Sequence, residues 1–371
     1  MSDSVIVIGA SAAGLAVARC LEEAGVTPLV LEASDSVGSM WRNAYERLHL
    51  HTSRRRSGLP YVPMPGNYPR YPSRVQMVDY LVAYAGALKS PPRFGERVTA
   101  IERSGEGWQV TTATGSHSTR NVVVATGNTR AADSPSWPGM ESFAGRILHS
   151  SAYRTGADFR GQRVLVVGFG NSACEIAIDL VEQGASPALA VRNPVNVIPR
   201  ELLGIPITSF GLISQIFPPR VADAINAPAL ALAIGDIRRL GLTPLPYGPI
   251  EQIVRHHRVP LIDIGTLKLI RDGRIVVRPG IDHFTTDKVA FVDGREEAYD
   301  AVILATGFRA GLGDLLPNVT GILDPDGAPR VSGGPTSAPG LYFCGFAVTP
   351  GGMLFRISHE ARELARLIAR R

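Results

Sequence analysis

The 371-residue sequence has little of several features that mark particular protein classes. Its three cysteines (Cys20, Cys174 and Cys344) are widely spaced, which excludes a C-x-x-C redox centre and a zinc ribbon. No apolar run approaches the roughly 20 residues that span a bilayer, so we expect no transmembrane segment. Because no charged leader precedes the first apolar run, we also expect no signal peptide. The cysteine pattern, without a C-x-x-C motif, predicts a reducing, cytoplasmic compartment.

Dense clusters of charge are also scarce. The net charge is +5, only three residues are lysine, and the basic residues are scattered apart from the run 54–56. This pattern does not predict a nucleic-acid-binding surface. His256 and His257 lie in a basic run without further ligands at metal-binding spacing, so we predict no metal site.

A glycine-rich dinucleotide-binding fingerprint, by contrast, occurs twice. The first copy is the apolar run 5–8, the turn G-A-S-A-A-G over residues 9–14, and a second apolar run that ends in Glu32. Such a turn places a pyrophosphate on a helix N-terminus, where free N–H groups and the helix dipole favour anions. The closing acid accepts hydrogen bonds from free ribose hydroxyls. This copy predicts an FAD site.

The second copy ends differently. The apolar run 164–167 leads into G-F-G-N-S-A over residues 168–173, and the next apolar run ends in Arg192. An arginine at this position accommodates the 2′-phosphate of NADPH. If Arg192 is instead a solvated surface residue, NADH use stays open. One chain is thus predicted to bind FAD and NADPH.

The strand endings show how the two copies are arranged. Ala125-Thr126-Gly127 closes an apolar strand before the second fingerprint, and Ala305-Thr306-Gly307 closes another after it. We therefore predict an α/β protein with two nested, three-layer Rossmann-like domains. The predicted FAD-binding domain comprises residues 1–154 and 296–371, and the NADPH-binding domain, 155–295, is inserted into it. Strands are expected over 99–112 and 116–125, and helices over 76–88 and 355–370.

Between the fingerprints, residues 143–153 read F-A-G-R-I-L-H-S-S-A-Y. This segment fits the F-x-G-x-x-x-H-x-x-x-(Y/F) pattern of class B flavin-dependent monooxygenases, which the chain resembles. Tyr153 stands where Baeyer–Villiger enzymes usually carry tryptophan, and so favours the heteroatom-oxidising branch. The stretches 45–51, 68–73, 197–201 and 261–265 are also similar to YUCCA-type enzymes, which convert indole-3-pyruvate to indole-3-acetate.

The resemblance implies a monooxygenase in which NADPH reduces FAD and the flavin then forms a C4a-(hydro)peroxide with dioxygen. That species oxygenates a small substrate, such as a 2-oxo acid that then loses carbon dioxide. Oxygenation at nitrogen or sulfur, an NADPH oxidase or flavin reductase, and a non-catalytic nucleotide-binding protein are the alternatives. The last is motivated by Ser11, which replaces the glycine that lets the backbone approach the pyrophosphate.

The candidate site residues come from the fingerprints and from the resemblance. We interpret His149 as a residue that organises the linker rather than as a base, and Cys174 as a packing residue. Arg200 and Arg309 are candidate partners of a substrate carboxylate, with surface roles as the alternative. The apolar stretch 202–245 has four alternative interpretations: helices that cover the core, the lining of a substrate pocket, a membrane contact or a homodimer face. The predicted FAD contacts are Gly9, Ser11, Ala13, Gly14, Glu32, Ala33, Met40, Trp41, His51, Thr52, Val98, Ala125, Thr126, Gly127, Gly345, Met353 and Leu354; the predicted NADPH contacts are Gly168, Gly170, Asn171, Ser172, Ala173, Arg192, Ala305, Thr306 and Gly307.

Overall fold

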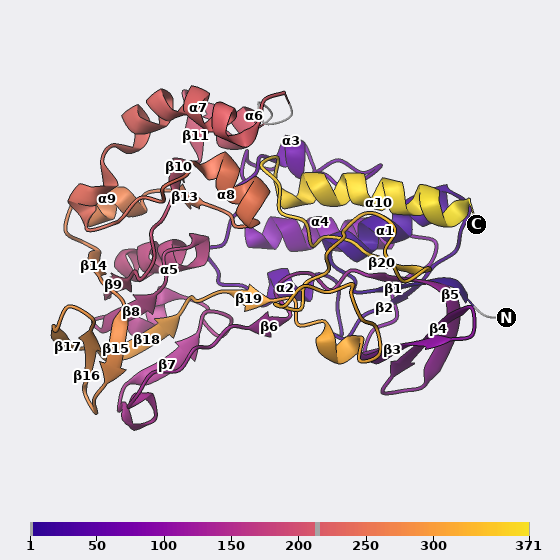
Figure 1. Cartoon of the computed structure of the whole chain (residues 1–371), viewed down its shortest axis with the longest axis horizontal. Coiled ribbons are helices and arrows are strands. Elements are labelled where there is room, and N and C mark those ends of the chain that lie inside the picture. Colours follow the sequence, from indigo (N-terminus) through magenta and orange to yellow (C-terminus); the bar gives the residue numbers. More distant parts are fainter. Residues whose placement is uncertain (1–2, 212–215, 371) are drawn as a thin grey trace. The chain divides into compact units, whose positions relative to one another are not determined.

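The structure of the protein is a computed structural model that describes residues 3–211 and 216–370 (Figure 1). The chain forms two compact units. The first comprises Met1–Asn43, Thr52–Ala131 and Phe308–Arg371, and the second comprises Ala44–His51 and Ala132–Gly307. The second unit is inserted into the first, as the order of the motifs predicts. Its boundaries differ from the expected 155 and 295, and it also includes the short segment 44–51.

The sheet of the first unit mixes parallel and antiparallel strands in the order β2-β1-β5-β4-β3, with β20 also paired to β5. β1, β2, β5 and β20 run parallel to one another, whereas β3, β4 and β5 are antiparallel. The expected strand over 99–112 is a hairpin, because Gly105 turns the chain with a positive φ of 56°. The strand bounds are β1 (Asp3–Ile8), β2 (Leu29–Leu31), β3 (Val98–Ser104), β4 (Gly107–Thr112), β5 (Ser116–Val124) and β20 (Leu341–Phe343).

The helices of the first unit cover this sheet. α1 begins directly after the first glycine turn and packs against α10, the C-terminal helix. α4 begins with a capping box, in which Ser73 and Gln76 satisfy each other's backbone N–H groups. The bounds are α1 (Ala12–Glu23), α2 (Ser39–Arg42), α3 (Arg54–Ser57), α4 (Arg74–Gly86), η5 (Gly313–Leu315) and α10 (Met353–Ala369).

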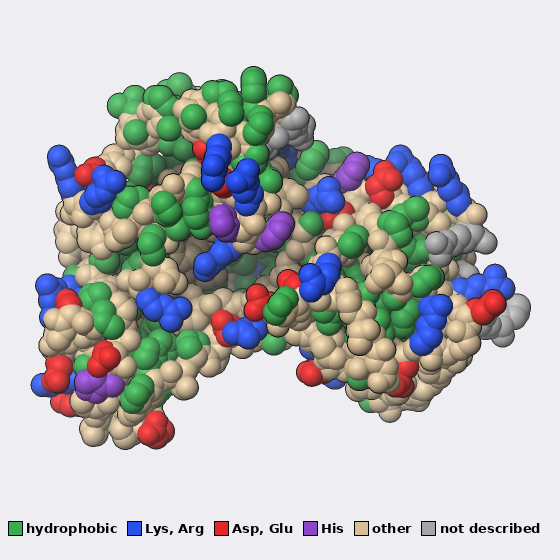
Figure 2. All heavy atoms as spheres, in the orientation of Figure 1, with side chains coloured by type: hydrophobic (Ala, Val, Ile, Leu, Met, Phe, Trp, Pro, Cys, Tyr) green, Lys and Arg blue, Asp and Glu red, His purple; other side chains and the backbone are tan. Residues whose placement is uncertain are grey.

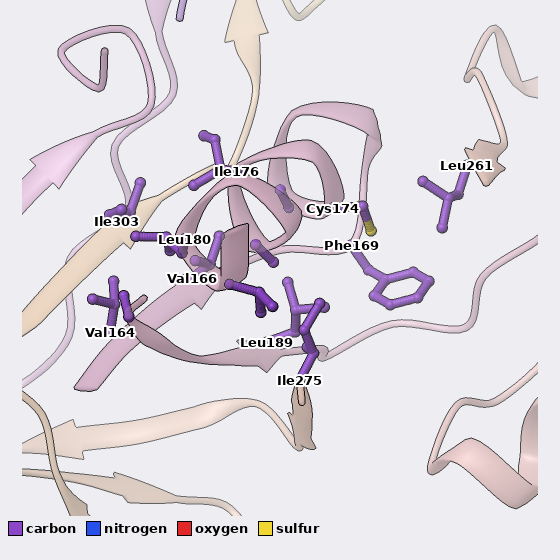
Figure 3. Close-up of a cluster of buried hydrophobic side chains, with 14 of the residues drawn as sticks. Val164, Val166, Phe169, Cys174, Ile176, Leu180, Leu189, Leu261, Ile275 and Ile303 are labelled. Atoms are coloured by element: carbon purple, nitrogen blue, oxygen red, sulfur yellow. The ribbon is translucent and has the colours of Figure 1, made fainter. Parts of the chain in front are cut away.

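The second unit has an all-parallel sheet in the order β14-β9-β8-β18-β7. Its core lies where α5 crosses β8 and β9, and there Val166, Leu189 and Leu180 are fully buried (Figure 3). Near-continuous apolar strands are typical of parallel sheets, which are covered on both faces. The bounds are β7 (Arg146–His149), η2 (Gly156–Phe159), β8 (Arg163–Val167), α5 (Asn171–Glu182), β9 (Ser186–Ala190), α9 (Thr266–Arg271), β14 (Val276–Arg278) and β18 (Ala301–Leu304).

Smaller elements complete the chain. β15, β16 and β17 form an antiparallel sheet, β10 pairs with β13, and β11 pairs with β12. β6 and β19 lie where the chain passes between the two units. The bounds are β6 (Ala131–Ala132), η1 (Met140–Ser142), β10 (Val197–Pro199), β11 (Glu201–Leu202), β12 (Ile205–Pro206), α6 (Ile207–Phe210), α7 (Pro219–Ile234), η4 (Ile237–Leu240), α8 (Pro249–His256), β13 (Leu261–Asp263), β15 (Ile281–Phe284), β16 (Lys288–Phe291), β17 (Glu296–Ala298) and β19 (Phe308–Arg309).

The apolar stretch 202–245 includes α7, whose surface is unusual for a solvent-facing helix. Only Ala222, Asp223 and Ile234 of this helix are buried, whereas Leu232 is 91% exposed. Figure 2 shows hydrophobic side chains gathered over α7. Residues 212–215 of the stretch lie outside the described residues. In the described part of the chain, every helix is too short or too polar to cross a membrane.

Candidate cofactor sites

The first glycine turn is shaped by two positions that exclude a side chain. Gly9 follows β1 with φ +108°, and a Cβ atom there would lie 2.7 Å from the carbonyl oxygen of Ala125. A Cβ at Gly14 would lie only 1.8 Å from the carbonyl oxygen of Gly9. Both positions therefore require glycine, since nothing larger fits the close approach of turn, helix and strand. The turn presents the N-terminus of α1.

Glu32 is held at the end of β2 beside this turn. The residue is 8% exposed. Its Oε2 accepts a hydrogen bond of 2.6 Å from the Ala10 N–H, and its Oε1 accepts from the backbone and the hydroxyl of Ser34. An ionised carboxylate has about four acceptor positions, so these three bonds orient the group and leave capacity for a ribose hydroxyl. Ser11 is the N-cap of α1, but its side chain makes no capping hydrogen bond.

The Ala125-Thr126-Gly127 turn lies beside the same glycines. The Ala125 N–H donates to the Ile8 carbonyl at 2.9 Å, and Gly127 has φ +73°. The hydroxyl of Thr126 is buried and has no hydrogen-bond partner among the described residues. A buried polar atom without a partner is costly and calls for a ligand or water. The donor set of this edge thus fits a bound dinucleotide such as FAD.

The C-terminal turn reaches the first fingerprint from the other end of the chain. A Cβ at Gly345 would lie 2.8 Å from the Cβ of Ala13, and the Gly345 N–H donates to buried Glu360 on α10. Gly352 caps α10 with φ +96°, where a Cβ would lie 2.5 Å from the methyl group of Thr52. Of the other predicted FAD contacts, Val98 and Leu354 are buried, Trp41 and Met353 are half-buried, and Ala33 and Met40 are exposed.

The second glycine turn repeats the geometry of the first. Gly168 has φ +122°, and a Cβ there would lie 2.6 Å from the carbonyl oxygen of Ala305. Gly170 is the N-cap of α5. Asn171 accepts a hydrogen bond from the Ile262 N–H at 2.8 Å and so ties the helix to β13. Ala173, at the position of Gly14, is fully buried. The free N-terminus of α5 fits a second pyrophosphate.

Arg192 follows β9 and is exposed. Its Cβ and Cγ atoms pack against Gly280, where an added Cβ would lie 3.4 Å from both. The Ala305-Thr306-Gly307 turn follows β18, on the other side of β8 from β9, and is held by hydrogen bonds within the second unit. The Thr306 hydroxyl donates to the Asp133 carbonyl, and the Asp133 N–H donates to the Gly307 carbonyl. An exposed arginine at the end of the strand next to β8, which leads into the glycine turn, fits the 2′-phosphate of NADPH.

His149 ends β7 and contacts the same turn. Its Nδ1 accepts from the Ser151 N–H at 3.1 Å, so Nε2 carries the proton and donates to the Gly307 carbonyl at 3.1 Å. Burial lowers the pKa of His149 below its usual 6.5. Tyr153 is buried and donates to Asp179 on α5 at 2.6 Å. His149 thus fixes the Gly307 turn, and Tyr153 fixes the chain after β7 to α5, both within the second unit.

Sequence reasoning missed a set of acidic residues on α5. Glu175, Asp179 and Glu182 follow one another at intervals of four and three residues, so they share one face of the helix. Glu182 makes a bidentate ion pair with Arg47, with both N–O distances 2.9 Å. His51, predicted to lie near the flavin, belongs to the second unit, and its Nε2 lies 2.8 Å from Oε1 of Glu175. The spacing of these acids along the predicted helix could have indicated that they share one face.

Several other candidates lie outside the two glycine turns. Arg200 belongs to the second unit and Arg309 to the first, so neither unit contains both. His256 stacks on Tyr247 with ring centroids 4.3 Å apart. The described residues hold no cluster of metal-ligating side chains. All three cysteines are free and buried, and burial raises their pKa values, that of Cys20 to about 12. Cys174 is thus a packing residue, as interpreted from the sequence.

Comparisons with known proteins agree with this geometry. A family model of flavin-binding monooxygenase-like proteins matches residues 2–315. The chain belongs to this family. It is 40% identical to indole-3-pyruvate monooxygenase YUCCA1 of Oryza sativa subsp. japonica over 359 residues, which cover 94% of this chain and 87% of the relative. It is 38% identical to the probable indole-3-pyruvate monooxygenase YUCCA1 of Arabidopsis thaliana, over 92% and 84% of the two chains.

Solved structures share the fold. A flavin-containing monooxygenase from Stenotrophomonas maltophilia matches with a TM-score of 0.75 and 26% identity, over 99% of this chain and 98% of that one. A cyclohexanone monooxygenase from Rhodococcus sp. Phi1 matches with a TM-score of 0.78 at 18% identity, over 99% and 84%. The predictions of two nested Rossmann-like domains and of an FAD- and NADPH-dependent flavin monooxygenase are confirmed.

Proposed function

We propose that FAD binds at the first glycine turn and NADPH at the second. The observation that carries this assignment is the opposite charge of the two residues that close the turns. Glu32 is buried and held by Ala10 and Ser34, where it suits free ribose hydroxyls, and Arg192 is exposed, where it suits a phosphate. The unpartnered Thr126 hydroxyl supports a ligand at the first turn.

We further propose that the substrate is a 2-oxo acid, with indole-3-pyruvate as the first candidate. The names of the relatives at 40% and 38% identity support this choice. FAD, when bound and reduced by NADPH, supplies the oxygen-activating chemistry. The residues of this chain bind and orient the two cofactors: the helix N-termini bind pyrophosphates, Glu32 and Arg192 distinguish the riboses, and the two Ala-Thr-Gly turns close over the ligands through their backbone.

The visible spectrum of the purified protein tests the proposal. We expect a flavin absorption band that bleaches with NADPH without oxygen and returns in air. With indole-3-pyruvate present, indole-3-acetate and carbon dioxide should form in proportion to NADPH consumed. Hydrogen peroxide released in step with NADPH, whatever substrate is offered, would instead identify an NADPH oxidase. Turnover of amines or sulfides but not of the oxo acid would contradict the substrate class alone.

Two further proposals concern assembly and location. The exposed apolar residues of α7, including Leu232 and Ile225, support a homodimer through this helix. Light scattering should then give twice the chain mass for the wild type and the chain mass for a Leu232→Glu, Ile225→Glu variant. An unchanged mass in the variant would exclude this interface. Three free, buried cysteines support a reducing compartment such as the cytoplasm.

A further inference from the structure

The segment Ala44–His51 belongs to the second unit although the chain on both sides of it belongs to the first. Contacts along its length hold it there. The Glu46 N–H donates to the Arg154 carbonyl at 2.8 Å, Arg47 pairs with Glu182, and the buried ring of Tyr45 meets Tyr153 edge to face with centroids 6.4 Å apart. Ordering this segment costs backbone entropy, so the contacts that hold it against α5 must compensate for that cost.

Glu175 is the anchor that is buried and not satisfied. Its side chain is 2% exposed, and neither carboxylate oxygen has a hydrogen-bond partner among the described residues. The Nε2 of His51 lies 2.8 Å from Oε1, but the approach lacks the angles of a hydrogen bond, and neither ring nitrogen is bonded elsewhere in the described chain. Burial of a carboxylate is costly unless hydrogen-bond donors face it. The distance of 2.8 Å between Nε2 and Oε1 is within the range of a charge-assisted hydrogen bond.

Tyr45 is the second potential donor to this carboxylate. Burial first, and then the adjacent Glu175 carboxylate, raise the pKa of Tyr45 well above its usual value. The phenol therefore keeps its proton at neutral pH and can donate it in a hydrogen bond. The hydroxyl of Ser172 also interacts with Tyr45. Ser172 is the second residue of α5, at the proposed pyrophosphate site, and Glu175 follows one turn later.

The other end of the segment leads directly to the proposed flavin site. The peptide bond between His51 and Thr52 returns the chain to the first unit. The Thr52 methyl group packs against Gly352 at the N-terminus of α10, and its hydroxyl bonds to that of Ser57 at 2.7 Å. The residue that directly follows the segment Ala44–His51 thus packs against the N-cap of α10.

We propose that Glu175 is a positioning residue for the flavin reaction. From α5 it holds His51, and the next residue in the chain, Thr52, belongs to the FAD unit. Glu175 acts through another residue, His51. This inference rests on the proposed function of the two turns. Loss of the Glu175 charge should loosen the segment and let reduced flavin lose its electrons to oxygen as hydrogen peroxide without oxygenating the substrate.

Glu175→Gln keeps the shape of the side chain and removes its charge. Glu182→Gln is the matched control, because it breaks the exposed anchor of the same segment through Arg47. In the FAD-loaded protein, hydrogen exchange of the peptide covering 44–52 should be about tenfold faster in Glu175→Gln, the change expected for one charge-assisted hydrogen bond. Peroxide released per NADPH should rise severalfold in Glu175→Gln. Both quantities should change little in Glu182→Gln.

The partner residue provides a second, independent test. His51→Gln and the double variant His51→Gln, Glu175→Gln should release as much peroxide as Glu175→Gln alone, since the two residues act as one unit. Additive effects, wild-type exchange in Glu175→Gln, or equal loosening by Glu182→Gln would each overturn the inference. If the wild type itself releases peroxide in step with NADPH, the proposed function fails, and hydrogen exchange alone still decides the role of Glu175.

Discussion

The two Rossmann-like units build the same glycine turn with different residues. In both, an alanine carbonyl oxygen packs against the first glycine. A Cβ atom would lie 2.7 Å from this oxygen at Gly9 and 2.6 Å from it at Gly168. The third position differs, because α1 approaches its strand so closely that Gly14 has no room for a Cβ, whereas α5 accommodates the buried methyl group of Ala173. The first helix is therefore the more tightly packed against its turn.

The two residues that we propose bind the riboses also differ between the units. Glu32 is buried and already makes three hydrogen bonds to its own unit, whereas Arg192 is exposed. A preorganised, buried acid suits a cofactor that stays bound, since little ordering is needed on binding. An exposed arginine suits a cofactor that enters and leaves with each turnover. The substitutions below test this difference position by position.

The largest effect is expected at the third glycine. Gly14→Ala places a methyl group 1.8 Å from the Gly9 carbonyl, so α1 must move and the FAD site should be lost, at a cost of more than about 3 kcal/mol. The reverse change, Ala173→Gly, should cost only about 1–2 kcal/mol from helix propensity and lost burial. Flavin content and thermal melting check both. A yellow, stable Gly14→Ala protein would show that the first turn is no tighter than the second.

Arg192 should govern the choice of nicotinamide cofactor. Arg192→Ala removes a charge-assisted contact to the 2′-phosphate, so the KM for NADPH should rise about tenfold while that for NADH stays nearly constant. Arg274→Ala removes an exposed arginine elsewhere in the same unit and serves as the control. Steady-state kinetics with both nucleotides provide the measurement. Equal losses for NADPH and NADH would assign Arg192 a role unrelated to the phosphate.

These local features were predictable from the sequence because they depend on neighbours in the chain. The turn at Gly9, the helix after it and the charge of Glu32 all follow from one stretch of about 25 residues, and α4 lies within two residues of its predicted bounds. The single strand expected over 99–112 was wrong, because the chain forms two strands there, joined by a turn at Gly105. Apolar alternation continues on both sides of Gly105 and does not reveal this turn.

The excursion of segment 44–51 was not predictable in the same way. Arg47 and Glu182 are 135 residues apart in sequence, and nothing near Arg47 indicates that its partner lies on the NADPH helix. Likewise, Tyr153 was recognised as part of a pattern, but its bond to Asp179 depends on how β7 and α5 pack. Pairings between side chains distant in sequence can be predicted only once the fold is known, whereas glycine turns can be predicted from a short stretch of sequence.

An intermediate effect is expected at the acid of the first unit. Glu32→Gln keeps the shape of the side chain but weakens the acceptors for Ala10, Ser34 and the ribose, so FAD affinity should fall about tenfold. Asp35→Asn neutralises an exposed acid three residues later and should leave FAD affinity unchanged. Fluorescence titration of apoprotein with FAD measures both. Unchanged affinity in Glu32→Gln would place the ribose elsewhere.

The smallest effect is expected at the second position of each turn, where the two units exchange serine and glycine. The Ser11 side chain caps nothing, and its φ of −109° is open to any residue, so Ser11→Gly should change FAD affinity by no more than about threefold. A Cβ at Gly170 would meet no atom within 4 Å, so Gly170→Ser should fold normally as well. Any loss of NADPH affinity in that variant then measures how closely the cofactor approaches the backbone. A gain of more than tenfold in FAD affinity for Ser11→Gly would show that serine obstructs the pyrophosphate, and that the first unit tolerates an imperfect fingerprint because Glu32 compensates for it.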